Sequence, residues 1–244
     1  MSPTANSSAP IVVLVHGAFA DAASWEGVIK ELYSADVASV APPNLLRGIG
    51  PDAAYLTSFV EQLDRPAILV GHSYAGAVIT QTGADAANAV GLVFVSAFSP
   101  EADEKVGDIN ARYPDVPLSA ALRTFNFPKG SAQPATDAFI DLDLFHDAFC
   151  ADVPAAQARV MALTQRPVSL DAFTTVVTGT PAWKKLPSWA VVATSDHAIH
   201  PDAERDMAKR AGSETVEIDG SHAVAVSQPA AVADVIMRAV KGTG

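Results

Sequence analysis

The sequence predicts an α/β fold built around a mostly parallel sheet, and two observations support this prediction. Short apolar runs rich in valine and isoleucine alternate with amphipathic stretches of helical periodicity, as in strand–helix–strand units. The chain has 244 residues, which is long enough to bury a substantial core without cross-links. Cys150 is the single cysteine, so neither an intrachain disulfide nor a thiolate zinc cluster can form.

The first strand–helix unit is expected at residues 11–34. The run IVVLVH at 11–16 is rich in β-branched residues, which indicates a buried strand. Residues 24–34 follow with apolar side chains spaced for one face of a helix, and Ser24 is a candidate N-cap. The next expected strand is DVASVA at 36–41, which ends where two consecutive prolines follow.

A second helix is expected at residues 51–64, because Leu56, Phe59, Val60 and Leu63 follow the helical spacing i, i+3, i+4 and i+7. A proline at its start suits the first helical turn. Another strand–helix–strand pass then follows, with a strand at 67–72, a helix from residue 73 onward and a strand at 89–98.

The alternation breaks down between residues 99 and 187. This stretch is rich in prolines and aromatic residues and has helical patches such as 153–165, so we interpret it as an inserted cap. The alternation of strands and helices then resumes, and Gly212 is a candidate C-terminal cap of one of the last helices. The expected elements of this final part are strands at 189–196 and 214–219 and helices near 201–212 and 228–242.

The charge and the N-terminus argue against nucleic-acid and membrane partners. The formal net charge is −11 at pH 7 and no lysine–arginine stripe interrupts it, so phosphate backbones would be repelled. The first ten residues, MSPTANSSAP, lack the basic and apolar regions of a signal peptide, and the apolar run after them is far too short to span a membrane. We therefore expect a cytoplasmic protein with no nucleic acid and no membrane as partner; the sequence leaves a homo-oligomer open.

The segment GHSYAG at residues 71–76 is the first candidate for a catalytic motif. A strand that ends at His72 and a helix that begins at Ser73 would place this serine on a sharp, exposed turn. The pattern matches the nucleophile motif G-x-S-x-G except that Ala75 replaces the second glycine. Ser73 is therefore either a nucleophile or merely a helix N-cap.

Two later residues favour the interpretation of Ser73 as a nucleophile. Asp196 ends one predicted strand, and His222 begins the loop after the next. The carboxyl ends of parallel strands meet at one edge of a sheet, so these residues can converge with Ser73. A serine hydroxyl becomes a nucleophile when an imidazole takes its proton, and a carboxylate fixes the tautomer of that imidazole and stabilises its positive charge. We therefore expect Ser73, Asp196 and His222 to be the catalytic residues.

Other acids and histidines compete for these roles. Asp103 follows the preceding strand and is the main rival for the acid, whereas Asp219 is expected only to end a strand. His72 neighbours the serine, but successive side chains at a strand end point in opposite directions, which makes it a poor base. His197 and His200 resemble a metal site only weakly, because no further ligand follows at a fixed spacing.

These motifs resemble those of the α/β-hydrolases. Besides GHSYAG, the similarity rests on HGAF at 16–19, TSD at 194–196 and DGSHAV at 219–224. Within that family the chain is similar to the small esterases related to plant methylesterases and hydroxynitrile lyases, with their bacterial relatives. The resemblance implies about six mostly parallel strands flanked by helices, with an inserted helical cap. The hydrolase core would comprise residues 1–98 and 187–244, and the cap residues 99–186.

The resemblance also implies an oxyanion hole and a substrate pocket. The family uses the backbone N–H of the residue after the nucleophile and another from the loop after the first strand, which here are Tyr74 and Ala18. A register error of one residue would exchange Ala18 with Phe19, which is otherwise expected to line the pocket. Cap aromatics, among them Trp183 and Phe145, are expected to form an apolar roof.

The implied function is hydrolysis of small, fairly apolar esters by a serine hydrolase through an acyl-enzyme. We expect no cofactor and no metal, since the sequence has no Walker motif, no strand-linked G-x-G-x-x-G and no ligand cluster. A lyase is an alternative, although Gly17 and Ala223 stand where cyanohydrin-cleaving relatives carry threonine or asparagine and, in some, lysine. Lactonase or perhydrolase activity fits the same triad, and a non-enzymatic ligand receptor is the alternative from another class.

Overall fold

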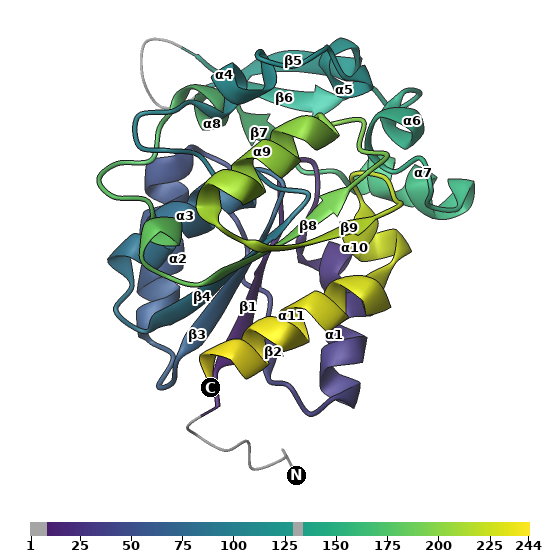
Figure 1. Cartoon of the computed structure of the whole chain (residues 1–244). Coiled ribbons are helices and arrows are strands. Elements are labelled where there is room, and N and C mark those ends of the chain that lie inside the picture. Colours follow the sequence, from purple (N-terminus) through teal and green to yellow (C-terminus); the bar gives the residue numbers. More distant parts are fainter. Residues whose placement is uncertain (1–8, 129–133) are drawn as a thin grey trace.

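The protein is built around a six-stranded parallel sheet with the strand order β2-β1-β3-β4-β8-β9. The computed structural model describes residues 9–128 and 134–244 (Figure 1). The predicted mostly parallel sheet with helices on its faces is confirmed. Its strands are β1 Ile11–Val15, β2 Ser39–Val40, β3 Ala67–His72, β4 Ala89–Val95, β8 Ser188–Ala193 and β9 Glu214–Ile218.

Helices cover both faces of the sheet and bury two apolar clusters against it. Along β1, Val13 and Val15 belong to one cluster and Val12 and Leu14 to the other, as the alternation of strand side chains requires. The first cluster packs beneath α2 (Ile49–Glu61), α3 (Ala75–Asp85) and α9 (Pro201–Ala211). The second packs beneath α1 (Glu26–Ser34), α10 (Val224–Ser227) and α11 (Pro229–Thr243) (Figure 1).

Two local expectations near the N-terminus need correction. Ser24 is not a helix N-cap, because the chain enters a 3-10 turn, η1 (Ala22–Trp25), before α1, and Asp21 caps that turn by accepting the Ala23 N–H at 2.8 Å. The strand expected at 36–41 is shorter, since only Ser39 and Val40 pair with β1. Its first residues instead close the end of α1, where the Val37 N–H donates to the Leu32 carbonyl.

The segment between β4 and β8 lies over the carboxyl ends of the central strands (Figure 1). It contains the expected helices but also an antiparallel sheet, β5-β6-β7, that the sequence analysis did not anticipate. The domain boundaries at residues 98/99 and 186/187 remain a prediction. The elements of this segment are α4 Val106–Asn110, α5 Pro117–Ala121, β5 Leu122–Phe127, β6 Ala135–Ile140, α6 Phe145–Phe149, α7 Ala155–Thr164, β7 Val168–Ser169, α8 Asp171–Thr174 and η2 Ala182–Lys184.

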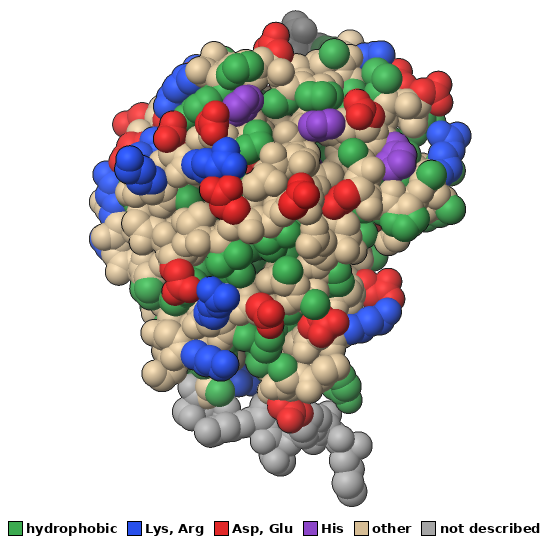
Figure 2. Space-filling view, turned by 45° about the vertical axis from the view of Figure 1, so that its right-hand side comes forward, with side chains coloured by type: hydrophobic (Ala, Val, Ile, Leu, Met, Phe, Trp, Pro, Cys, Tyr) green, Lys and Arg blue, Asp and Glu red, His purple; other side chains and the backbone are tan. Residues whose placement is uncertain are grey.

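An ion pair ties this segment to the core. Arg47, in the loop after β2, places two guanidinium nitrogens 2.8 and 3.1 Å from the carboxylate oxygens of Asp137 on β6. On the face shown in Figure 2, acidic and basic side chains are interspersed rather than gathered into a basic stripe. Across residues 9–128 and 134–244, no helix has both the length and the apolar character needed to cross a membrane.

Candidate active site

Ser73 sits on a strained turn between β3 and α3. Its φ of 55° lies in the left-handed region, which costs a non-glycine residue about 1–3 kcal/mol and persists only where neighbouring structure enforces it. The enforcing contacts are backbone hydrogen bonds to the end of β4. The Ser73 N–H donates to the Val95 carbonyl at 3.2 Å, and the Ser73 carbonyl accepts the Phe98 N–H at 3.2 Å.

The glycines around Ser73 are required by close backbone contacts. A Cβ on Gly71 would lie 2.7 Å from the Ala75 carbonyl oxygen, and one on Gly76 would lie 2.2 Å from the Phe98 carbonyl oxygen. Ala75 itself is fully buried in the first apolar cluster, so its methyl group has space. The tight glycines of this turn are therefore Gly71 and Gly76, which explains why alanine is tolerated at position 75.

His222 and Asp196 form a buried pair at the same edge of the sheet. The His222 Nδ1 atom lies 2.6 Å from Asp196 Oδ2, and the two residues are 1% and 3% exposed. The other carboxylate oxygen, Oδ1, accepts the N–H groups of Ala198 at 2.6 Å and Ile199 at 2.9 Å. Burial alone would raise the pKa of Asp196, but the charge and hydrogen bond of His222, with other hydrogen bonds, hold it below its ordinary value.

Ser73 and His222 line the same small cavity of about 60 Å³. Both side chains are described by the structure, and no hydrogen bond joins them there. Catalytic hydrogen bonds are often long or misaligned in a free enzyme and tighten when substrate binds. The arrangement thus brings a hydroxyl, an imidazole and a carboxylate into one place, without a hydrogen bond between the hydroxyl and the imidazole.

His72 supports His222 rather than Ser73. Its Nε2 atom lies 2.9 Å from the His222 carbonyl oxygen, to which the neutral ring can donate, and the two rings are 4.6 Å apart. Burial, followed by the nearby charge of His222, lowers the pKa of His72 to about 3. His72 therefore stays neutral at ordinary pH and anchors the loop that carries His222.

Two backbone N–H groups border the cavity beside Ser73. Ala18 and Tyr74 both line it, and within the described ranges neither amide has a hydrogen-bond acceptor. The Phe19 N–H is engaged, because it donates to the Arg166 carbonyl at 3.2 Å. This difference favours Ala18 over Phe19 as the second donor to an oxyanion. The Tyr74 hydroxyl points elsewhere and donates to Asp52 Oδ2 at 2.8 Å.

Of the three residues expected to line the pocket, one does so. Phe19 lines the cavity, whereas Trp183 and Phe145 do not. The Trp183 indole N–H donates to the Pro100 carbonyl at 3.0 Å, and its ring lies beside Arg210. Phe145 is fully buried and packs 5.1 Å from the Phe149 ring. Both are packing residues.

The apolar wall is made instead by residues that the sequence analysis missed. Short helices of the cap and the loops after β4 and β8 supply it, and their apolar residues follow no periodic pattern that would single them out. Phe173 is one of the cap aromatics expected to form the roof, and the missed cavity residues are Phe98, Val106, Gly107, Asn110, Leu118, Ala198 and Ile199. Phe149, another of the cap aromatics, packs its ring 5.0 Å from the His222 ring.

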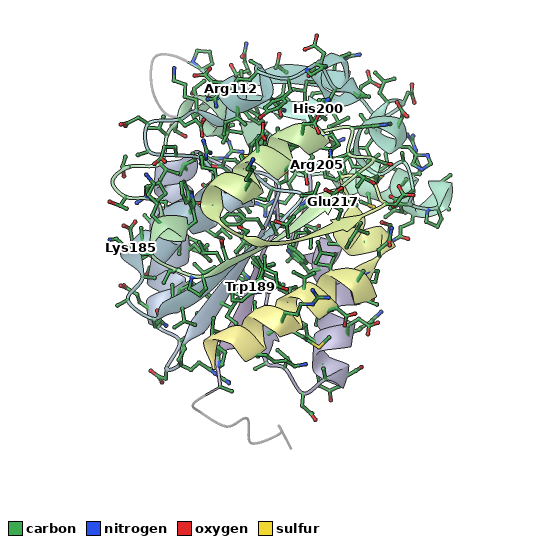
Figure 3. All side chains as sticks on the ribbon, in the orientation of Figure 1. Arg112, Lys185, Trp189, His200, Arg205 and Glu217 are labelled. Atoms are coloured by element: carbon green, nitrogen blue, oxygen red, sulfur yellow. The ribbon has the colours of Figure 1, made fainter. Side chains whose placement is uncertain are left out.

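The competing residues do not line the cavity that Ser73 and His222 share. Asp103 has a φ of 63° and donates its N–H to the Val177 carbonyl, while Asp219 accepts the Ser195 hydroxyl at 3.1 Å. His197 Nδ1 lies 2.8 Å from the Asp147 carbonyl oxygen, and His200 caps α9, as Figure 3 shows at the start of that helix. In the part of the chain that the structure describes, no cluster of His, Cys, Asp and Glu could hold a metal ion.

Comparisons with known proteins agree with this fold. A family model described as the alpha/beta hydrolase family matches residues 12–235. Polyneuridine aldehyde esterase is similar in structure, with a TM-score of 0.81, 17% identity, and coverage of 95% of this chain and 99% of that one.

Two further solved structures show the same fold. A methylesterase from Arabidopsis has a TM-score of 0.78 at 17% identity, with 96% of this chain and 99% of that chain covered. A pyrethroid hydrolase from Sphingobium faniae has a TM-score of 0.76 at 17% identity, with 95% and 97% covered. No curated protein matches the sequence.

Proposed function

Because the chain belongs to the alpha/beta hydrolase family, we propose that it is a serine hydrolase that cleaves small, fairly apolar carboxylic esters through an acyl-enzyme. One observation carries the proposal. The Asp196–His222 pair, joined at 2.6 Å, borders the same cavity as Ser73 on its strained turn. The similar structures named esterase, methylesterase and pyrethroid hydrolase support an ester as the small-molecule substrate.

In the proposed reaction, His222 takes the proton of Ser73 as the hydroxyl oxygen attacks the acyl carbon. Asp196 stabilises the imidazolium and keeps Nδ1 protonated, so that Nε2 is the basic atom. The N–H groups of Ala18 and Tyr74 would bind the oxyanion of the tetrahedral intermediate. His222 then protonates the leaving alcohol, and a water molecule activated by His222 hydrolyses the acyl-enzyme.

The size and the apolar walls of the cavity support a substrate with a small acyl group. Its volume is about 60 Å³, and apolar side chains such as Phe98, Leu118 and Ile199 contribute to its wall. Every proposed step uses groups of the chain and water, so the scheme invokes no cofactor or metal. The cytoplasmic location, the absence of nucleic-acid and membrane partners and the homo-oligomer left open by the sequence remain predictions.

Hydrolysis of p-nitrophenyl esters by three proteins tests the proposal. The wild type should cleave the acetate faster than the octanoate, and Ser73→Ala should reduce the rate at least a hundredfold. Ser188→Ala is the matched control, because Ser188 is also buried but begins β8 at the opposite edge of the sheet. Residual activity of Ser73→Ala above a hundredth of the wild-type rate would place the nucleophile elsewhere. Release of benzaldehyde from mandelonitrile, without ester cleavage, would favour a lyase.

A further inference from the structure

Glu204 is a buried acid directly behind the catalytic pair. It lies on α9 and is 3% exposed, although glutamate is rarely buried without a partner. Its Oε2 atom accepts the Ala193 N–H at 3.1 Å, at the end of β8. Its carboxyl group lies within hydrogen-bonding reach of the Asp196 carboxyl group. Within the described ranges, no N–H or hydroxyl group donates to the buried Oε1 atom.

A hydrogen bond between two carboxyl groups requires that one of them carries a proton. Asp196 already receives three hydrogen bonds, from the Ala198 N–H, the Ile199 N–H and His222, which stabilise its negative charge. Glu204 receives one, from Ala193. The charge is therefore held on Asp196 and the proton on Glu204, whose Oε1 atom is free to donate it.

The charges around Glu204 agree with this assignment. Burial, followed by the negative charge of Asp196, raises the pKa of Glu204 well above its ordinary value. Arg205 acts against this shift, but less than the other groups that act on Glu204. Its guanidinium is directed to the surface, where it binds Glu217 at 2.8 Å and Asp202 at 2.7 Å; Figure 3 shows Arg205 near Glu217.

Among the described residues, no other charged side chain lines the void beside Glu204. The side chain borders a void of about 10 Å³ whose other walls are uncharged residues from β4, β8 and α9 and from the loop after β4. These walls are Phe94, Ala97, Ser99, Ala190, Val191, Val192 and Ala208.

We propose that Glu204 is a positioning residue: its neutral carboxyl group donates a hydrogen bond to Asp196 and fixes the rotamer in which Asp196 orients His222. The catalytic role of Glu204 rests on the proposed function, whereas the sharing of one proton between Glu204 and Asp196 does not. Without this donor, Asp196 would keep its two backbone N–H groups but lose the contact from α9. A carboxylate that accepts one hydrogen bond fewer attracts the His222 proton more strongly. Glu204 therefore also affects the basicity of His222.

Two substitutions separate positioning from packing. In Glu204→Gln, the amide carbonyl can accept the Ala193 N–H and the amide nitrogen can donate to Asp196, so kcat should stay within about threefold of wild type. Glu204→Leu removes both contacts and should lower kcat at least tenfold with little change in KM. The acid limb of its kcat/KM profile should also move to higher pH, which loss of packing alone does not cause. Glu217→Gln, an exposed acid that pairs with the same helix, is the control and should match wild type.

The pH dependence of stability tests the shared proton independently of activity. A carboxyl group with a raised folded-state pKa takes up a proton on folding, so its contribution is complete below the unfolded-state pKa and is lost as pH rises towards the folded-state value. Between pH 5 and 8, the folding equilibrium constant of wild type should fall relative to that of Glu204→Gln by up to about tenfold per pH unit. Other titrating groups cancel in this difference.

Each outcome has a distinct meaning. Parallel stability profiles for wild type and Glu204→Gln would show that Glu204 is ionised and overturn the inference. A different slope together with full activity of Glu204→Leu would overturn the positioning role. If the stability profiles of wild type and Glu204→Gln differ in slope but the wild type hydrolyses no ester, the proposed function is contradicted. The shared proton between Glu204 and Asp196 is then still supported.

Discussion

Gly76→Ala is the substitution that probes the strained turn most sharply. Gly76 lies one residue into α3, and an added Cβ would meet the Phe98 carbonyl oxygen at 2.2 Å and the Ala97 Cβ at 2.9 Å. Ordinary contact begins near 3.4 Å, so the helix and the chain after β4 must separate by about 1.2 Å. The Phe98 N–H donates to the Ser73 carbonyl, and the displacement therefore reaches Ser73 directly.

The effect on activity should exceed the effect on stability. Overpacking costs roughly 1–3 kcal/mol, and the better helix propensity of alanine returns about 1 kcal/mol. The net loss of unfolding free energy should thus be about 0–2 kcal/mol. A misplacement of about 1 Å at the reacting groups can cost about 10²-fold in rate, equivalent to about 2.7 kcal/mol of transition-state stabilisation.

Urea denaturation and p-nitrophenyl acetate hydrolysis measure the two effects on the same samples. Gly50→Ala is the matched control, because Gly50 lies in the first turn of α2 and an added Cβ there meets nothing within 4 Å. It should leave kcat/KM unchanged and stabilise the protein by up to about 1 kcal/mol. If Gly76→Ala were as active as wild type, the close approach of α3 to the chain after β4 would not be what positions Ser73.

Three further predictions concern the acid, the thiol and the tyrosine hydroxyl. Asp196→Asn should lower kcat about 10⁴-fold by stabilising the wrong tautomer, while Asp103→Asn should not; the reverse result in steady-state assays would reassign the acid. Burial raises the pKa of Cys150 to about 12, so Ellman's reagent at pH 8 should react slowly with the native protein and rapidly in urea, and fast native labelling would contradict the burial. Tyr74→Phe removes a donor from buried Asp52 and should destabilise the protein by about 1–3 kcal/mol in urea titrations while kcat changes only a few-fold; a hundredfold loss of kcat would implicate the hydroxyl in catalysis.

The sequence was sufficient for the sheet and for the residues at its strand ends. Buried parallel strands read as short runs of β-branched residues, and a parallel sheet brings their carboxyl ends to one edge. Knowing where β3, β8 and β9 end was therefore enough to place Ser73, Asp196 and His222 close together. No three-dimensional information was needed for that step.

The lining of the cavity and the burial of Glu204 could not be predicted in this way. Trp183 and Phe145 are aromatic cap residues like Phe173, and only the packing of the cap decides that Phe173 meets the cavity while the other two do not. Glu204 belongs to an amphipathic helix whose other acids, Asp202 and Asp206, are exposed. Its burial follows from the way α9 packs on the sheet, which depends on contacts far apart in sequence.

Covalent labelling tests the identity of the nucleophile most directly. A fluorophosphonate reacts with an activated serine and leaves a stable adduct, which intact-protein mass spectrometry counts and peptide mapping locates. Wild type and Ser188→Ala should each gain one adduct, on the peptide that contains Ser73, and Ser73→Ala should gain none. Labelling of Ser73→Ala at the wild-type rate, or an adduct on any other residue, would contradict the assignment of Ser73 as the nucleophile.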